Sequence, residues 1–517
     1  MKEPMMQQKT ERRISAALRL AQVAILLISQ IVLVTLLSHF LRQRLIYAYS
    51  ILEAAALLCA LRIYNRPGDA TYKPGWILLV LAVPVVGMVL YLLWSGDRPE
   101  KRLDLKNIPY PKEPEAIQTA SRDRIDALSR THAEWGRLAL YMDRHGSALW
   151  DGTAAAYLPT GEAYLSDLLQ SLESARRFIF LEYFIASHGQ IWDRLTGVLV
   201  RKAAQGVEVK LILDDFGSMF RLHPEDEDWL AERGVEVCFF NPVHHYVNRL
   251  YFNYRDHRKI AVIDGNIAYT GGVNLADEYA NLVDRFGYWK DGGVRLEGQG
   301  AWGLTREFLH LWVRLGREVA QDFDAYRPTC TAENAGYCQT LADGPDNNPS
   351  DPAEDAFLQL IAGGKRQVWI TTPYLAVDET MVRTLCIAGD SGVDVRLLLP
   401  GTPDHPYAFT VAESYFGDLL RHHVKLYRYE PGFLHSKMVM VDGEAAFVGS
   451  VNMDYRSFRL HFECGTLLYD MPAIADIAAD MESIAHQSHQ VDLAEWKGRP
   501  RWRRLLGSVL KPFASWM

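Results

Sequence analysis

The stretch HRKIAVIDGNIAYTGGVN, residues 257–274, is repeated imperfectly as HSKMVMVDGEAAFVGSVN, residues 435–452. The two copies share residues in the same order: His257, Lys259, Asp264 and Asn274 in the first, and His435, Lys437, Asp442 and Asn452 in the second. In each copy an apolar run between lysine and aspartate predicts a short strand, and the Asp-Gly dipeptide that follows is a turn signal. One short motif arises easily by chance, whereas two copies with matching context predict a duplicated structure.

The duplication extends upstream of both motifs. RFIFLEYF (177–184) corresponds to QVWITTPY (367–374), GVEVKLILD (206–214) to GVDVRLLLP (392–400), and GVEVCFFNP (234–242) to VKLYRYEP (424–431). Apolar strands that alternate with helical stretches predict α/β units with a mixed or parallel sheet. Two unrelated α/β domains could look alike, but the ordered agreement of four blocks argues against it. We therefore predict two similar α/β halves that pack about a pseudo-twofold axis.

Changes in composition divide the chain into segments. Residues 141–325 and 352–490 are the two α/β halves, and residues 326–351, rich in Gly, Pro, Asn and Asp, are an inter-domain loop. We predict a membrane anchor over residues 1–95 and a polar, proline-containing linker over residues 96–140. Residues 491–517 form a tail in which basic and aromatic residues alternate.

The N-terminal segment contains long uncharged runs. Residues 20–40 and 75–94 each match the length needed to cross a bilayer core of roughly 30 Å. Residues 45–64 are interrupted by Glu53 and Arg62, so two or three spans are possible. A cleaved signal peptide fits poorly, because the first run starts late and lacks a small-residue cleavage site. Basic residues flank the first and last runs, which favours a cytoplasmic location for the rest of an integral membrane protein if the number of spans is even.

Charge and cysteine usage exclude several classes of function. The formal net charge of −8 argues against a nucleic-acid partner, which would favour a basic protein. The six cysteines show no Cys-x-x-Cys spacing, so neither a zinc site nor a disulfide framework is indicated. We expect no metal and no cofactor. The tail suits an anionic membrane surface; the alternative is a solvated tail whose tryptophans pack on the domain.

The repeated residues carry a recognisable chemistry. Positions i and i+2 of a strand face the same side, so each histidine projects together with its lysine. Two halves related by a pseudo-twofold axis would bring both pairs to one site, with two imidazoles, two ammonium groups and two amides. That set fits phosphoryl transfer without a metal: one histidine attacks phosphorus, the other acts as acid and base, and the cations hold the phosphate oxygens. Asp264 and Asp442 either orient a catalytic group or hold the Asp-Gly turn.

The chain resembles the phospholipase D superfamily and, within it, the bacterial cardiolipin synthases, over nearly its whole length. The resemblance rests on RDHRKIAVIDGNIAYTGGVNLADEY (255–279), GFLHSKMVMVDGEAAFVGSVNMDYRS (432–457) and YWKDGGVRLEG (288–298). It implies that His257 and His435 are the catalytic pair, with the first as nucleophile. It also places Lys259, Lys437, Asn274 and Asn452 around the phosphate. Glu463 matches a family position, and is either a site residue or an ordinary strand carboxylate.

The resemblance also implies a reaction. Two phosphatidylglycerol molecules would give cardiolipin and glycerol through a phospho-histidine intermediate, at a bacterial inner membrane and among anionic lipids. A phospholipase D hydrolase that uses water is the nearest alternative. A nuclease is disfavoured by the negative net charge of the chain and by the long apolar runs near its N-terminus. A non-catalytic scaffold that binds phospholipid head groups is disfavoured because both histidines are present. The sequence leaves the oligomeric state open.

Overall fold

A computed structural model describes residue 32 and residues 45–66, 73–94, 103, 105–219, 221–223, 225–242, 253–319, 321–333, 335–346 and 350–516. The described residues form two compact units. The large unit comprises those within 104–241 and 254–511, and the small unit those within 1–103, 242–253 and 512–517.

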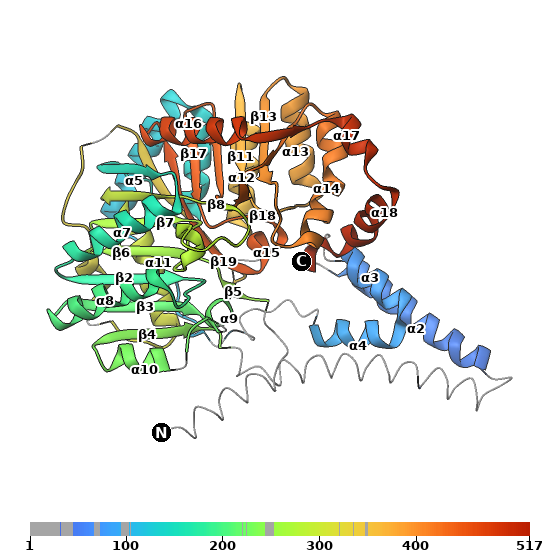
Figure 1. The fold of residues 1–517 in the computed structure, drawn as a ribbon, viewed down its shortest axis with the longest axis horizontal. Helices are drawn as coiled ribbons and strands as arrows, with labels where there is room; N and C mark the ends of the chain where they lie inside the picture. The colour runs from blue at the N-terminus through green and yellow to red at the C-terminus, as the bar shows by residue number, and fades with distance from the viewer. Residues whose placement is uncertain are drawn as a thin grey trace. The chain divides into compact units, whose positions relative to one another are not determined.

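Two sheets with the same strand order build the large unit (Figure 1). The first is, in spatial order, β1 (Thr153–Leu158), β9 (Gly293–Gly298), β7 (Ile267–Gly271), β6 (Lys259–Ile263), β2 (Phe178–Tyr183), β3 (Glu208–Asp214) and β4 (Val235–Phe240). The second is β10 (Tyr337–Asp343), β19 (His461–Tyr469), β17 (Ala445–Gly449), β16 (Met438–Val441), β11 (Gln367–Thr371), β13 (Asp394–Pro400), β14 (Lys425–Tyr429) and β20 (Ser488–Val491). The orders match strand for strand, with β20 added, so the prediction of two similar α/β halves is confirmed. Both sheets are mixed, with β2, β3 and β4 parallel to one another, like β11, β13 and β14.

Helices cover both sheets. Those of the first half are α7 (Gly161–Ser174), α8 (Gln190–Ala204), α9 (Asp215–Ser218), α10 (Glu225–Ala231) and α11 (Ala301–Arg314). Those of the second are α12 (Pro352–Gly363), α13 (Glu379–Asp390), α14 (Pro406–Arg421), α15 (Tyr455–Arg459) and α16 (Ala473–His486), followed by α17 (Leu493–Gly498) and α18 (Arg501–Leu510). Two of them also cross between halves: α11 packs on β2 and β10, and α16 packs on β16 and β1.

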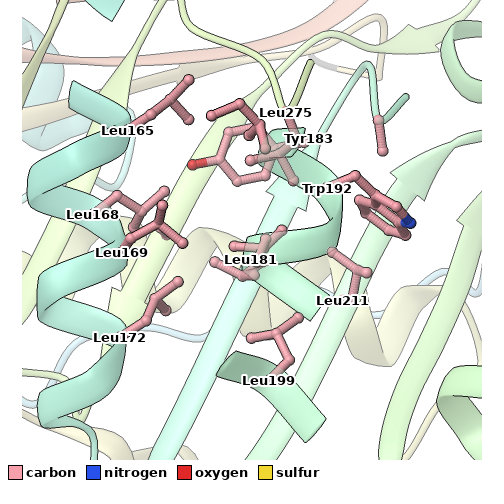
Figure 2. Close-up of a cluster of buried hydrophobic side chains, with 14 of the residues drawn as sticks. Leu165, Leu168, Leu169, Leu172, Leu181, Tyr183, Trp192, Leu199, Leu211 and Leu275 are labelled. Atoms are coloured by element: carbon pink, nitrogen blue, oxygen red, sulfur yellow. The ribbon is translucent and has the colours of Figure 1, made fainter. Parts of the chain in front are cut away.

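The core of the first half shows why these residues form these elements. Figure 2 shows Leu165, Leu168, Leu169 and Leu172 along one side of α7, facing Leu181 of β2. Their spacing of three and four residues is the helical period that gathers apolar side chains into one stripe. All are buried. Each such side chain contributes about 1.5–3 kcal/mol relative to an exposed position.

Short strands join the two halves reciprocally. β5 (Arg255–Asp256) pairs in parallel with the start of β19 from the second half. β15 (Gly432–Leu434) pairs in parallel with β8 (Tyr288–Lys290) from the first half. β5 and β15 are the segments directly before the two repeated histidines. In both pairings, the strand before a repeated histidine pairs in parallel with a strand of the other half. This is expected for halves related by a pseudo-twofold axis.

Two predicted connecting segments turn out to contain regular structure. The predicted linker 96–140 includes α5 (Glu115–Thr131) and most of α6 (Ala133–Arg144), which pack into the large unit through Ile125, Leu128 and Trp135. The predicted inter-domain loop 326–351 includes β10, paired along its whole length with β19. The prediction of unstructured connections was wrong for these two segments. Charged residues are frequent in α5 and α6, and turn residues surround β10, so the short amphipathic pattern of each element was not recognised.

The small unit contains α2 (Leu45–Asn65), α3 (Lys73–Ala82) and α4 (Pro84–Trp94). Ala56, Ile63, Val80 and Tyr91 form its buried cluster. The run 75–94 divides into two helices at Pro84, whose ring removes a backbone donor. Within the described ranges, no helix combines the length and apolar character needed to cross a membrane. The predicted span 20–40, apart from Val32, lies outside the described residues.

Candidate active site

The reciprocal strands place the two repeated histidines. The backbone N–H of His257 donates to the carbonyl of Phe462 at 2.9 Å, and that of His435 donates to the carbonyl of Lys290 at 2.7 Å. Each histidine backbone is therefore anchored to the opposite half of the molecule. The two side chains are almost buried, with 8% and 7% of each residue exposed.

A carboxylate from the opposite half orients each imidazole. His257 Nδ1 lies 2.9 Å from Glu463 Oε1, and His435 Nδ1 lies 2.5 Å from Asp291 Oδ2. A carboxylate only accepts hydrogen bonds, so each Nδ1 carries the proton and donates, and each Nε2 keeps its lone pair. Both rings thus present a nucleophilic or basic nitrogen.

Sequence reasoning found Glu463 as a candidate but missed Asp291. The two carboxylates are equivalent in the repeats: Asp291 stands two residues before Gly293, and Glu463 two residues before Gly465. Gly293 pairs with Gly271, and Gly465 pairs with Gly449, in the same place of each sheet. A comparison of the repeats beyond the asparagines would have identified Asp291.

The surroundings of these two carboxylates differ. Glu463 accepts hydrogen bonds from Ser450 Oγ at 2.5 Å and Ser457 Oγ at 2.7 Å. Asp291 accepts from the backbone N–H of Gly292 at 2.8 Å. It also packs so closely on Gly272 that a Cβ there would overlap the carboxylate. The two serine hydroxyls therefore hold Glu463 beside His257, and the close packing on Gly272 holds Asp291 beside His435.

Two buried lysines complete the site. Lys259 Nζ donates to the carbonyl of His257 at 2.5 Å, and Lys437 Nζ donates to that of His435. Burial lowers the pKa of Lys259 to about 8 and that of Lys437 to about 7. Burial and then the charge of Lys437 lower the pKa of His435 to about 4.

The two motifs act on one another electrostatically. Burial, then Lys259 and Lys437, lower the pKa of His257 well below its usual value, so a lysine of the second half influences a histidine of the first. Burial alone would raise the pKa of Asp291, but His435 and Lys437 hold it below its usual value. The two lysines and two histidines place several groups that can carry positive charge in one buried site. A bound anion stabilises their charged forms, and a phosphodiester is such an anion.

The two asparagines are not equivalent. Asn274 Oδ1 accepts from the backbone N–H of Ile185 at 3.0 Å, and its Nδ2 donates to the Tyr279 hydroxyl at 2.8 Å. Asn452 Oδ1 is buried and has no hydrogen-bond partner among the described residues. Asn274 is thus engaged by the protein at both ends of its amide, and Asn452 is the asparagine with spare capacity.

The repeated aspartates hold turns away from the histidines. Asp264 accepts from the backbone N–H groups of Arg176, Arg177 and Phe178. Asp442 does the same for Lys365, Arg366 and Gln367. Both have positive φ, of 54° and 57°. Each lies seven residues from its histidine, across a strand, or roughly 23 Å at the rise of extended chain. Their inclusion as catalytic candidates is therefore corrected: they stabilise the Asp-Gly turns.

Three residues of the site are of types that bind metal ions. His257, His461 and Glu463 could each direct one ligand atom to a common point. However, Glu463 is already engaged by His257 Nδ1, and the charges that lower the pKa of His257 are those of Lys259, Lys437, His435 and Arg456, all positive when protonated. A divalent cation would meet this field, so the residues do not fit a metal, and no step is assigned to one.

Binding of an anion to the site should weaken as the pH rises from 6 to 9. Lys437 and Lys259 are charged below their pKa values of about 7 and about 8 and lose this charge above them. Tungstate affinity, measured by calorimetry, should therefore be highest near pH 6, fall by about tenfold per pH unit between these values, and fall by up to about a hundredfold per pH unit above both. Lys437→Met should remove the lower step, whereas the exposed Lys365→Met should not. An affinity independent of pH would contradict the assignment.

Comparisons with known proteins agree with this site. A sequence model of the family described as "Cardiolipin synthase, PLD-like domain" matches residues 168–284 and 357–485. A second model, described as "Phospholipase_D-nuclease N-terminal", matches residues 54–96. The first model thus covers both repeats, including both His-Lys pairs.

Relatives match over most of the chain. A cardiolipin synthase of Geobacillus kaustophilus is 34% identical over 95% of this chain and 98% of its own. The major cardiolipin synthase of Bacillus subtilis is 30% identical over 88% of this chain and 95% of its own. The crystal structure of a phosphatidylserine synthase from Haemophilus influenzae superposes with a TM-score of 0.55 at 14% identity, over 70% of this chain and 92% of that one. This last likeness concerns the fold alone.

Paired His-x-Lys motifs in duplicated halves, together with these relatives, define a phosphatidyltransferase of the phospholipase D type. Within that superfamily the chain belongs to the bacterial cardiolipin synthases. The family expected from the motifs is confirmed.

Proposed function

We propose that the chain transfers a phosphatidyl group from one phosphatidylglycerol to the terminal hydroxyl of another, through a phospho-histidine at His257. The observation that carries this proposal is the reciprocal pairing of His257 with Glu463 and of His435 with Asp291. It leaves two Nε2 atoms available in one site, and double displacement at phosphorus needs one nucleophile and one acid-base group.

The steps follow from these groups. His257 Nε2 forms a bond to phosphorus while the bond to the glycerol oxygen breaks, and His435 gives that oxygen its proton. The second lipid's hydroxyl then gives its proton to His435 and attacks phosphorus, and the bond to His257 breaks. Lys259 and Lys437 hold the non-bridging oxygens. Burial, and then the charge of Lys437, lower the pKa of His435 to about 4. Bound phosphate raises it, so the acid form is available when the substrate is present.

The surroundings of His435 favour an alcohol over water as the acceptor. The rings of Trp289, Tyr279 and Phe433 lie 5.3, 5.5 and 5.6 Å from that of His435, centroid to centroid. An aromatic enclosure limits the entry of water to the acid-base group and suits the glycerol of a lipid head group. We therefore place the transferase ahead of a phospholipase D hydrolase.

Purified enzyme incubated with phosphatidylglycerol vesicles is expected to form cardiolipin and glycerol in equal amounts. Lipid mass spectrometry and an enzymatic glycerol assay measure both products. His257→Ala, purified in the same way, is the control for contaminating activity. Phosphatidic acid as the main lipid product would instead establish the hydrolase. The absence of any product, with lipid still bound, would establish a scaffold.

We also propose that the enzyme works on a bacterial inner membrane, with the large unit on the cytoplasmic side. The uncharged N-terminal runs support an anchor, and α18 supports a surface contact. Gly507 is the one buried residue of α18 and lies against Thr410 of α14. Trp502 and Leu505 are 62% and 67% exposed beside three arginines, and such a face suits an anionic bilayer.

Leu505→Glu is expected to lower turnover of phosphatidylglycerol in vesicles by roughly tenfold, because about 1.5–3 kcal/mol of apolar burial in the bilayer is lost. Turnover of the same lipid in detergent micelles should change little. Ile387→Glu, at an exposed position of α13, is the matched control. Equal losses in vesicles and micelles would contradict a role of α18 at the membrane.

A further inference from the structure

The two sides of the site differ where the repeats differ. Trp289, two residues before Asp291, lies beside His435. The equivalent residue of the second half is His461, two residues before Glu463, and its ring lies 5.5 Å from that of His257. His257 also has an aromatic neighbour, Phe184, whose ring lies at 5.0 Å. The sides therefore differ in that the repeats place a polar ring, His461, where the other side has Trp289.

The polar side also carries an arginine. Arg456, on α15, donates from Nε to His461 Nε2 at 3.4 Å. His461 Nδ1 faces Glu463 Oε1 at 3.7 Å, beyond hydrogen-bond length, so the carboxylate that orients His257 also lies beside His461. Arg456 is partly exposed. This chain of contacts holds a guanidinium one imidazole ring away from His257.

The charge of Arg456 acts on the buried carboxyl of Asp454, two residues before it, but no ion pair joins these two side chains, both of which the structure describes. Within the described part of the chain, the ion pairs include none between Arg456 and a carboxylate. Its equivalent in the first half is Glu278, since each stands four residues after the repeated asparagine. Glu278 is paired with Arg221 at 2.5 Å and Arg285 at 3.1 Å. The asymmetry leaves one cation available on the His257 side.

Arg456 is near enough to act on the site but is not needed for the reacting phosphate. After burial, Lys259, Lys437 and His435, it is a further cause of the lowered pKa of His257. The buried lysines already provide cations for one phosphodiester. A partly exposed guanidinium offers a fork of donors that matches the oxygens of a second phosphate.

We propose that Arg456, positioned by His461, forms a second phosphate subsite that binds the non-reacting phosphodiester of the acceptor lipid. The inference rests on the proposed function and deepens it, because phosphatidylglycerol as acceptor carries its own phosphate one glycerol unit from the attacking hydroxyl. The product then holds two phosphates joined by that glycerol. Neutral alcohols and water lack the second phosphate, so the subsite selects the lipid acceptor.

Binding of soluble head groups tests the subsite without turnover. The probes are deacylated cardiolipin, with two phosphates, and deacylated phosphatidylglycerol, with one. Calorimetry on the full chain should show that the wild type binds the first at least about tenfold more tightly, the size of one charge-assisted hydrogen bond. Arg456→Gln should reduce the preference to within about twofold, and Arg456→Lys should keep part of it. Arg201→Gln, at an exposed position of α8, should keep all of it.

Acceptor competition then tests the selection. With phosphatidylglycerol vesicles and added ethanol, Arg456→Gln should lower the ratio of cardiolipin to phosphatidylethanol by about tenfold or more. Total donor consumption should stay within a few-fold of the wild type. An unchanged ratio, or an unchanged preference for the two-phosphate probe, would overturn the subsite. A wild type that makes neither transfer product would refute the proposed function, while the binding test would still decide the subsite.

Discussion

A covalent phosphatidyl adduct is expected to form in His435→Ala and to be absent in His257→Ala. His257→Ala removes the nucleophile, so no adduct can form with any donor. His435→Ala removes the acid and base, at a cost of roughly 10²- to 10⁴-fold in rate with phosphatidylglycerol. That loss should shrink with a nitrophenyl phosphodiester, whose leaving group needs no proton. Because release to an alcohol still lacks a base, the adduct on His257 should accumulate in this variant.

Peptide mass mapping under alkaline conditions, where phospho-histidine survives, measures the adduct. The wild type with the nitrophenyl donor and excess acceptor alcohol is the control, because there the adduct should turn over. An adduct on His435 in the His257→Ala variant would mean that the two roles are reversed. Retained transfer with no adduct in either variant would mean direct displacement by the second lipid.

The carboxylates behind the histidines are expected to be nearly as important as the histidines. In Asp291→Asn and Glu463→Gln the amide NH2 can turn toward Nδ1 and favour the tautomer that carries its proton on Nε2. That tautomer can neither attack nor accept a proton, so we expect losses of roughly 10²- to 10⁴-fold in kcat. Ser457→Ala removes one hydrogen bond to Glu463 and leaves the carboxylate in place, so its effect should be far smaller.

The two carboxylate variants should fail at different steps. With the nitrophenyl donor, Asp291→Asn should accumulate the adduct like His435→Ala, and Glu463→Gln should form it slowly like His257→Ala. Adding His435→Ala to Asp291→Asn should cost little more than either alone, because both act through one imidazole. Fully multiplicative losses in the double variant would contradict this coupling. Thermal unfolding of each variant controls for losses of fold.

Much of this architecture could be predicted from local patterns. Strands with an apolar period, Asp-Gly turns and repeated block order identified both halves, because these signals depend on neighbours only a few residues apart. The spacing of His257 and Lys259 predicted a shared face, as did that of His435 and Lys437. The same local reasoning failed for β10 and for α5 and α6, whose apolar faces are completed by distant elements: β19 pairs with β10, and α12 packs on α6.

By itself, the sequence determined the duplicated α/β halves, the family, and the two His-Lys pairs. Only the tertiary structure decided how these pairs are supported. Glu463 reaches His257 across 206 positions and Asp291 reaches His435 across 144, each from the opposite half. It also decided that Asp264 and Asp442 cap turns at the far ends of their strands. The physical reason is that periodicity specifies which face a side chain occupies, whereas its partner across a sheet or between halves depends on how the whole chain packs.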